Sequence, residues 1–368
     1  MPAVPAGSKI LVTGANGFVA MWVVRTLLQS GYRVRGTIRS DDKGDFIKQY
    51  FSEFGDKLEL STVPDIEKDG AFDEAVKDVD AIEHTASPYH YGADDPAELI
   101  QPAIKGTVGI LKSAMRCGSS VKRIVITTST AAVVRPTQEP LLFNEDDWNN
   151  DSIRQVEEEG VNAPGYIKYF ASKTLAEKAA FEFYNENRDS VKWDLVTIAP
   201  PYVFGPTIND VQTISTANTS IVEWYETIFE SAKGTLALSK VGNAWLDVRD
   251  LALAHVRAIQ RQEAQGRIIV SSGSFKWHDF CESGHTPRAN ELSHPYSRMT
   301  VTSAKSLSPR IYRENAFTPA DPNYDPNKAV HELNFDTSKA ERLLGMTEYI
   351  PLDKCTRDML EDFHGRGW

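Results

Sequence analysis

Cysteine is scarce in this chain. Its three cysteines are Cys117, Cys281 and Cys355, and none stands in the C-x-x-C spacing typical of redox and zinc motifs. We therefore expect neither a disulfide framework nor a bound metal. So few cysteines favour a reducing compartment, and we expect the protein to be cytoplasmic.

Long apolar runs and an excess of positive charge are also lacking. No stretch of about 18 apolar residues occurs, which predicts no membrane-spanning helix. The segment Met1–Lys9 has two prolines and no apolar core, so it is not expected to be a secretory signal. The 40 Lys and Arg residues against 51 Asp and Glu give a net charge of −11. Because such a surface repels phosphate backbones and anionic lipids, neither nucleic acid nor a membrane is an expected partner.

Strand-like and helix-like patterns alternate through the first 200 of the 368 residues. Short apolar segments typical of buried strands are Lys9–Thr13, Arg33–Ile38, Leu58–Val63, Ala81–Thr85, Arg123–Thr128 and Asp194–Ala199. Segments with helical spacing are Phe18–Gln29, Ala97–Arg116 and Tyr166–Asn187. This order predicts an α/β fold, a doubly wound parallel sheet with helices on both faces.

The pattern becomes irregular after Pro201, where Val203–Asn218 has the composition of a loop. Later segments with a regular pattern are helices at Ile221–Ser231, Val248–Gln260, Asp336–Leu344 and Leu352–Phe363, and a strand at Arg267–Ser271. We expect residues 1–200 to form the large domain, with 245–272 returning to it. Residues 201–244 and 273–368 would form a smaller, interleaved C-terminal lobe.

A glycine-rich turn follows the first strand. It reads Thr13-Gly14-Ala15-Asn16-Gly17-Phe18-Val19-Ala20. Glycine at 14 allows a tight turn, glycine at 17 allows close approach to a pyrophosphate, and the small Ala20 lets the helix approach the sheet. The helix N-terminus then offers free N–H groups to phosphates. A plain glycine turn is the alternative, but the position between a strand and an amphipathic helix favours a dinucleotide site formed by Gly14, Asn16, Gly17, Phe18 and Val19.

Arginine stands where NAD-binding proteins usually carry an acidic residue. Arg39 follows the second strand and can hold a 2′-phosphate in a bidentate way, which favours NADPH. Asp41 and Asp42 lie close by and keep NAD as the alternative. Asp65, after the third strand, is placed to reach the adenine. His84, at the end of the fourth strand, is expected to be a buried strand histidine rather than a catalyst.

A tyrosine and a lysine stand four residues apart, at Tyr169 and Lys173. On a helix they lie on one face, one turn apart, and an ammonium beside a phenol lowers the phenol's pKa from its ordinary value of about 10. A surface pair is the alternative. Tyr324 and Lys328 share the spacing, but Pro326 lies between them and breaks any helix. Helix formers follow Lys173.

A hydroxyl at the end of the fifth strand would complete this group. The strand ends in Ile124-Val125-Ile126-Thr127-Thr128-Ser129-Thr130. We choose Ser129, with Thr130 as the alternative. Its hydroxyl would hydrogen-bond the substrate oxygen as charge develops on it.

Together these motifs resemble the extended short-chain dehydrogenase/reductases. T-G-A-N-G-F-V-A, I-T-T-S-T, Y-F-A-S-K and A-P-P-Y-V-F-G-P carry the likeness, which runs to about residue 280 and resumes near Asn327. Within the family, the chain is most similar to the dihydroflavonol 4-reductase and fungal aldehyde or methylglyoxal reductase branch. The resemblance implies an NADP-binding Rossmann domain and Ser129, Tyr169 and Lys173 as the catalytic residues. Further implied cofactor contacts are Arg39, Asp65, Ile66, Thr85, Ala86, Tyr169, Lys173, Pro200 and Val203.

The resemblance also implies an activity. NADPH would give a hydride to the carbonyl carbon of an aldehyde, ketone or α-dicarbonyl while Tyr169 gives a proton to the oxygen. The enzyme would be a monomer or homodimer. Candidate substrate-pocket residues, each equally compatible with ordinary core, are Ser87, Pro88, Ala131, Tyr202, Val203 and Trp224.

Two other functions remain open. A nucleotide-sugar epimerase or dehydratase would use the same fold, but dehydratases usually carry an acidic pair where Thr130, Ala131 and Ala132 follow Ser129. A non-catalytic NADP-sensing regulator would tend to lose the tyrosine and lysine that this chain keeps.

The segment Cys281–Ser308 fits no expected element. Gly284 and Pro287 stop a helix, and the few apolar residues keep no period. It is either a genuine loop near the substrate mouth or a mistranslated segment such as a retained intron, and we favour the second. We predict that it is poorly ordered and supplies no catalytic group, so His285 and His294 are not read as ligands.

Overall fold

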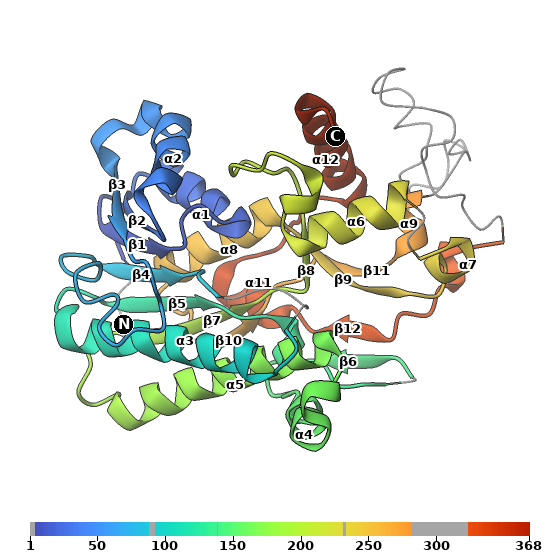
Figure 1. Ribbon diagram of the computed structural model, residues 1–368, viewed down its shortest axis with the longest axis horizontal. Helices are drawn as coiled ribbons and strands as arrows, with labels where there is room; N and C mark the ends of the chain where they lie inside the picture. The colour runs from blue at the N-terminus through green and yellow to red at the C-terminus, as the bar shows by residue number, and fades with distance from the viewer. Residues whose placement is uncertain (1–3, 88–92, 138, 231–232, 282–322) are drawn as a thin grey trace.

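A parallel sheet of seven strands runs through the middle of the molecule (Figure 1). The structure is a computed structural model and describes residues 4–87, 93–137, 139–230, 233–281 and 323–368. The strands are β1 (Lys9–Thr13), β2 (Arg33–Ile38), β3 (Leu58–Thr62), β4 (Ala81–His84), β5 (Arg123–Thr127), β7 (Asp194–Ala199) and β10 (Gly266–Ile269). They pair in the order β10-β7-β5-β4-β1-β2-β3, so their carboxyl ends lie along one edge.

Helices cover both faces of this sheet (Figure 1). Helices α1 (Phe18–Gln29) and α8 (Val248–Gln260) pack on one face, and α3 (Ala97–Cys117) and α5 (Gly165–Asn187) on the other. Side chains alternate along each strand, so Ile10 and Val12 of β1 contact the first layer while Leu11 contacts the second. Both faces are covered, which explains why inner strands such as β1 and β5 are near-continuous apolar runs.

Shorter helices complete the large domain. Helix α2 (Gly44–Tyr50) lies between β2 and β3, α4 (Asn150–Glu159) contacts α5, and α11 (Ser338–Leu344) contacts α8 and β10. Asp247 caps α8 by accepting a hydrogen bond of 2.8 Å from the N–H of Arg249. The α11 helix ends at Gly345, whose φ of 66° is left-handed.

A second, smaller group of elements lies beside the carboxyl edge of the sheet (Figure 1). Its three-stranded sheet, in the order β11-β9-β8, consists of β8 (Tyr202–Phe204), β9 (Gly242–Asp247) and β11 (Gly273–Lys276). Its helices are α6 (Thr219–Phe229), α7 (Thr235–Leu238), α9 (Trp277–Cys281) and α12 (Leu352–Arg366). They enclose an aromatic core that includes Phe204, Trp224, Trp245, Phe275 and Phe363.

The predicted α/β fold and the six predicted strands of the first 200 residues are confirmed, with ends that agree within one residue. Later boundaries differ more. The predicted helix at Ile221–Ser231 is Thr219–Phe229, that at Asp336–Leu344 begins at Ser338, and the last extends to Arg366. The stretch Val203–Asn218 is not all loop because it contains most of β8. The short pair β6 (Leu141–Phe143) and β12 (Leu333–Phe335) was not foreseen.

The described helices include none that is both long and apolar enough to cross a bilayer. Within the same part of the chain, no three His, Cys, Asp or Glu side chains are grouped to hold a metal ion.

Arg123 connects β5, β7 and α8 from a buried position. Its guanidinium, 1% exposed, donates two hydrogen bonds of 2.8 Å to the carboxylate of Asp194 on β7. It also donates to the carbonyl oxygens of Ala258 and Arg261 at the end of α8, at 2.6 and 2.5 Å. One charged side chain thus satisfies helix-end carbonyls that would otherwise have no partner.

We expect Arg123→Met to lower the free energy of unfolding by about 3–5 kcal/mol, because it leaves the Asp194 carboxylate and two carbonyls without their donor. Arg154→Met is the control. Arg154 pairs with Asp151 on the surface of α4 and is 66% exposed, so its loss should change stability by about 1 kcal/mol or less. Denaturant unfolding measures both, and equal small losses would contradict the role given to Arg123.

Candidate active site

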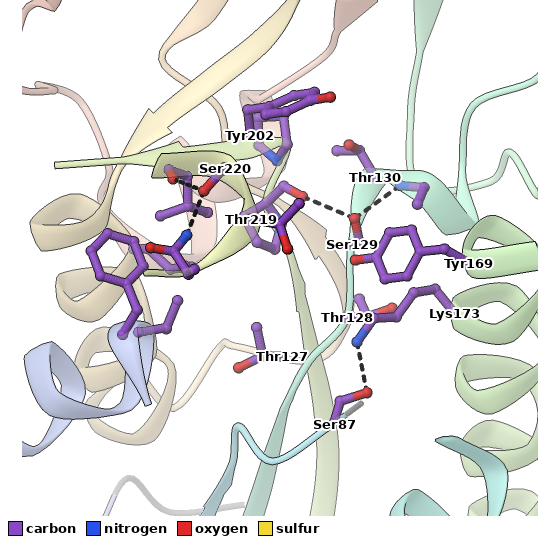
Figure 2. A pocket seen from close by; sticks show the side chains of 18 of the residues that line it. Ser87, Thr127, Thr128, Ser129, Thr130, Tyr169, Lys173, Tyr202, Thr219 and Ser220 are labelled. Carbon is purple, nitrogen blue, oxygen red and sulfur yellow. Dashed lines mark hydrogen bonds between the residues drawn. The ribbon is translucent and has the colours of Figure 1, made fainter. Parts of the chain in front are cut away.

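A cavity of about 940 Å³ opens at the carboxyl ends of β1, β4, β5 and β7. Its walls come from the glycine turn before α1, the strand ends, α5, and the segment from Pro200 through α6. Figure 2 shows Ser129, Tyr169 and Lys173 on one side of this space and Thr219 and Ser220 on another. The cavity therefore lies between the large sheet and the smaller lobe.

The glycine turn is shaped for close approach. Gly14 has a φ of 64°, and a Cβ there would lie 3.2 Å from the Cβ of Ala86. Its N–H donates to the hydroxyl of Thr37 on β2 at 3.1 Å. Gly17 is the N-cap of α1 and supplies no side-chain cap. The first-turn residues Phe18 and Val19 line the cavity, so free N–H groups of a twelve-residue helix lie at its wall.

The hydroxyl of Thr13 connects the ends of β1 and β4 by hydrogen bonds. Thr13 Oγ1 accepts from the N–H groups of Thr85 and Ala86, both at 3.1 Å, and therefore gives its own proton to His84 Nδ1 at 2.9 Å. Burial, with a contribution from Lys173, lowers the pKa of His84 to about 3. His84 is thus a neutral, packed histidine, as expected from the sequence. Thr85 lines the cavity, and Ala86 contacts the turn at Gly14.

Several charged residues surround the far end of the glycine turn. Arg39 is exposed just beyond β2 and makes no hydrogen bond or ion pair with any described residue. Asp41 accepts a hydrogen bond from Thr62, and Asp42 is largely exposed. Lys43, which sequence reasoning missed, lines a small hollow together with Asn16. Two cations and two carboxylates thus flank this end, and Lys43 lies 3.9 Å from the carboxylate of Asp42.

Asp65 and Ile66, both predicted as cofactor contacts, lie outside the cavity wall. Asp65 is exposed, and its carboxylate accepts a hydrogen bond of 2.9 Å from the N–H of Glu67. Ile66 is half-buried against α3, where a Cβ at Gly106 would lie 3.0 Å from its Cδ1. Asn16 belongs to the small hollow rather than to the cavity.

Tyr169 and Lys173 lie one turn apart on α5 and line the cavity. Each is 8% exposed, and Lys173 Nζ lies 5.7 Å from the centre of the Tyr169 ring. The ammonium donates a 2.8 Å hydrogen bond to Ser87 Oγ. Burial lowers the pKa of Lys173 to about 8, and the nearby Glu177 opposes this shift. Figure 2 shows the phenol end of Tyr169 pointing toward Ser129.

Ser129 begins a short turn after β5. Its Oγ accepts from the N–H of Ala131 at 3.1 Å, and its proton has only a long contact of 3.5 Å to the carbonyl of Pro200. The hydroxyl proton is therefore weakly held and can turn toward a ligand. Thr130, the alternative, lines the cavity as well, but its side chain is 5% exposed.

Buried polar contacts fix α5 against its neighbours. Glu177, one turn beyond Lys173, accepts from Thr197 at 2.7 Å and from Arg267 at 3.2 Å. At the other end, the ammonium of Lys168 donates to the carbonyls of Ala93, Asp94 and Val161. Because these partners come from separate segments, the helix that carries Tyr169 and Lys173 cannot shift without breaking them.

The predicted substrate residues divide into two groups. Ser87, Ala131, Tyr202 and Val203 line the cavity. Trp224 does not, and this prediction is corrected: its side chain is 0% exposed and contacts Phe229, Phe280 and Phe363 in the core of the smaller lobe. Cavity residues that sequence reasoning missed include Thr127, Tyr166, Phe170, Asn218, Thr219 and Glu223. Tyr166 precedes Tyr169 by three residues, and this helical spacing was a usable signal.

The residues around Cys281–Ser308 lie almost wholly outside the described part of the chain. Cys281 is the last residue of α9. Residues 282–308, including His285 and His294, are not described, and the same holds for Pro88.

Comparison with known proteins identifies the family. The model of the NAD dependent epimerase/dehydratase family matches residues 10–271. The chain belongs to this family. It is 36% identical over 356 residues to the ketoreductase azaE of Aspergillus niger, covering 95% of this chain and 96% of that protein. It is 38% identical over 281 residues to the NADPH-dependent methylglyoxal reductase GRE2 of Saccharomyces cerevisiae, covering 74% of this chain and 80% of that protein.

One solved structure resembles this chain over nearly its whole length. Yeast methylglyoxal/isovaleraldehyde reductase Gre2, complexed with NADPH, superposes with a TM-score of 0.79 at 31% identity, covering 97% of this chain and 99% of that one. The resemblance to extended short-chain dehydrogenase/reductases of the aldehyde reductase branch, drawn from four motifs, is confirmed.

The core position of Trp224 predicts a stability effect rather than a binding effect. We expect Trp224→Ala to lower the free energy of unfolding by about 3–5 kcal/mol through loss of buried area and an unfilled cavity. Tyr202→Ala, at the cavity wall, should instead act mainly on the apparent KM of a carbonyl substrate. Denaturant unfolding and steady-state kinetics together separate the two, and a stable Trp224→Ala protein with a raised KM would restore the original assignment.

Proposed function

We propose that this protein is an NADPH-dependent reductase of aldehydes and ketones. The observation that carries the proposal is the meeting of Ser129, Tyr169 and Lys173 in one cavity with the glycine turn. These side chains come from β5 and α5, and the turn from β1, so the fold alone brings them together. A ketoreductase and an NADPH-dependent methylglyoxal reductase among the relatives support the same reaction class.

The wall of the cavity fits the cofactor. The uncapped N-terminus of α1 and the left-handed Gly14 leave room and free N–H groups for a pyrophosphate. Arg39 and Lys43 are the cations available for a 2′-phosphate. The residues we propose to hold the cofactor are Gly14, Asn16, Gly17, Phe18, Val19, Arg39, Asp65, Ile66, Thr85, Ala86, Tyr169, Lys173, Pro200 and Val203.

The catalytic step follows from the three side chains. When bound, NADPH supplies a hydride from C4 of its nicotinamide to the carbonyl carbon. Tyr169 gives its phenolic proton to the carbonyl oxygen, and the ammonium of Lys173 stabilises the phenolate that results. Ser129 keeps its proton and donates a hydrogen bond to the same oxygen as charge develops there. The low exposure of Tyr169 and Lys173 keeps water from weakening these interactions.

The substrate end of the cavity is largely apolar and aromatic. Tyr166, Phe170, Tyr202 and Val222 contribute to it, beside Ser87 and Ala131. Such a wall suits a carbonyl flanked by apolar groups. A nucleotide-sugar substrate is disfavoured because the turn after Ser129 has no acidic residue: Thr130, Ala131 and Ala132 are all buried there.

We also propose how the chain divides between the cofactor and the substrate. Residues 1–200 with 245–272 bind the cofactor, and residues 201–244 with 273–368, apart from α11, complete the substrate side. We propose a cytoplasmic monomer or homodimer without nucleic acid partners, supported by the net charge of −11 and the scarcity of cysteine.

Tyr169→Phe is expected to lower turnover by about 10²–10⁴-fold, because the proton donor is removed. NADPH affinity should stay nearly unchanged. Following NADPH absorbance with a panel of aldehydes, ketones and diketones measures the first, and fluorescence titration the second. Tyr184→Phe is the control, since Tyr184 lies on the same helix but stacks on Trp193 away from the cavity. Wild-type turnover by Tyr169→Phe would overturn the mechanism.

Arg39→Ala is expected to weaken NADPH binding by roughly 10- to 150-fold while leaving NADH binding nearly unchanged, since a charge-assisted hydrogen bond contributes about 1.5–3 kcal/mol. Lys43→Ala, tested beside it, shows whether the second cation shares the 2′-phosphate. Titration of both cofactors by fluorescence makes the comparison. An equal loss for NADPH and NADH would show that Arg39 does not recognise the 2′-phosphate.

A further inference from the structure

A buried acid and a buried histidine lie directly behind the cavity wall and take no part in the proposed mechanism. Glu83 on β4 and His255 on α8 are both 0% exposed, and Glu83 Oε2 lies 2.6 Å from His255 Nδ1. The other ring nitrogen, Nε2, lies 3.0 Å from the hydroxyl of Thr127, the last residue of β5. Thr127 lines the cavity, so the chain of contacts runs from the interior to the ligand space.

The position of Thr127 separates it from the catalytic group. Figure 2 shows it apart from Tyr169 and Lys173, across the strand ends. The side chains of Thr127 and Arg123 both contact α8, so they lie on the same face of the sheet. Leu251, one turn before His255 on α8, also lines the cavity. This wall therefore lies on the side of the cavity opposite to α5.

Hydrogen-bond bookkeeping gives Thr127 two possible states. A hydroxyl has one proton. If His255 Nε2 is bare, Thr127 must donate to it and can only accept from a ligand. If Nε2 carries a proton, Thr127 accepts that proton and its own hydroxyl proton is free to point into the cavity. The Glu83/His255 pair decides between these states by holding one proton or two.

The surroundings of Glu83 favour the state in which the Glu83/His255 pair holds two protons. Its second carboxyl oxygen, Oε1, is buried and has no hydrogen-bond partner among the described residues. Burial raises the pKa of Glu83, against the opposing effects of His255 and Arg123. Arg123 is already bound to Asp194, so it compensates Glu83 only in part. A carboxyl group that shares its proton with Nδ1 leaves the proton of Nε2 for Thr127.

We propose that Glu83 and His255 are positioning residues that hold the Thr127 hydroxyl as a hydrogen-bond donor toward the bound cofactor. The inference rests on the proposed function for the identity of that ligand. Glu83 and His255 touch neither substrate nor cofactor, and they act only through Thr127.

A comparison of NADPH affinities tests the inference. Thr127→Val removes the hydroxyl at nearly constant volume and should weaken NADPH binding by about threefold to tenfold, the effect of one hydrogen bond, while Thr127→Ser restores it. The double variant Glu83→Leu/His255→Leu removes the pair without leaving a buried unpaired charge. The hydroxyl of Thr127 then keeps its proton but loses its orientation, so the double variant should weaken binding less than Thr127→Val does, and adding Thr127→Val to it should cause a smaller loss than in the wild type.

The outcomes are distinct. Additive losses in the triple variant, or an unchanged affinity in Thr127→Val, would overturn the relay. A wild-type protein that binds no NADPH would instead overturn the proposed function. Thermal melting of each variant shows whether it is folded before it is titrated.

A spectroscopic measurement on the wild type alone keeps the inference testable if the double variant does not fold. Long-range ¹H–¹⁵N correlation of ¹⁵N-histidine protein reports which ring nitrogens carry protons. His84 is an internal reference, because its hydrogen bond from Thr13 requires a bare Nδ1. We expect His255 to have a protonated Nε2, and a bare Nε2 would show that Thr127 is an acceptor and overturn the proposal.

Discussion

Parallel pairing of β1, β4, β5 and β7 is the constraint on which the rest of the structure depends. It brings four carboxyl ends to one edge, and each end supplies a different part of the cavity: the glycine turn, Ser87, Ser129 and Pro200. None of these residues is close to the others in sequence. The chemistry proposed here therefore depends on strand register as much as on the side chains themselves.

Buried polar contacts make this arrangement specific. Apolar packing would tolerate small shifts of a helix on the sheet, but Glu177 and Lys168 on α5 each have partners from two or more other segments. Arg123 on β5 and His255 on α8 likewise connect α8 to the sheet through buried polar contacts. Because an unpaired buried group is costly, these contacts favour one position of each helix and so fix the catalytic side chains.

Local patterns predicted the glycine turn, the Tyr169 and Lys173 pair and the strands of the large domain, because each depends on neighbours in sequence. The position of Trp224 could not be predicted in this way. Its helix, α6, has partners on more than one side, and the sequence does not say which face meets the cavity. The pairing of β6 with β12 was missed because three-residue strands carry no period and their partners are far apart in the chain.

Long-range contacts also explain why Thr127 and Lys43 escaped notice. Nothing in the sequence around Thr127 shows that Glu83 and His255 lie behind it, since the three belong to separate elements. Lys43 follows Arg39 by four residues, but only the fold shows that it shares a hollow with Asn16.

In the proposed reaction, a hydride passes from the cofactor to a carbonyl carbon in this cavity. The most direct measurement is reduction of an aldehyde or ketone with NADPH deuterated at C4 of the nicotinamide, in ordinary water, followed by mass spectrometry of the product. We expect an alcohol with deuterium on its carbinol carbon when the label occupies the transferred position. An alcohol without deuterium from either C4 epimer of the labelled cofactor, or no net oxidation of NADPH, would contradict it.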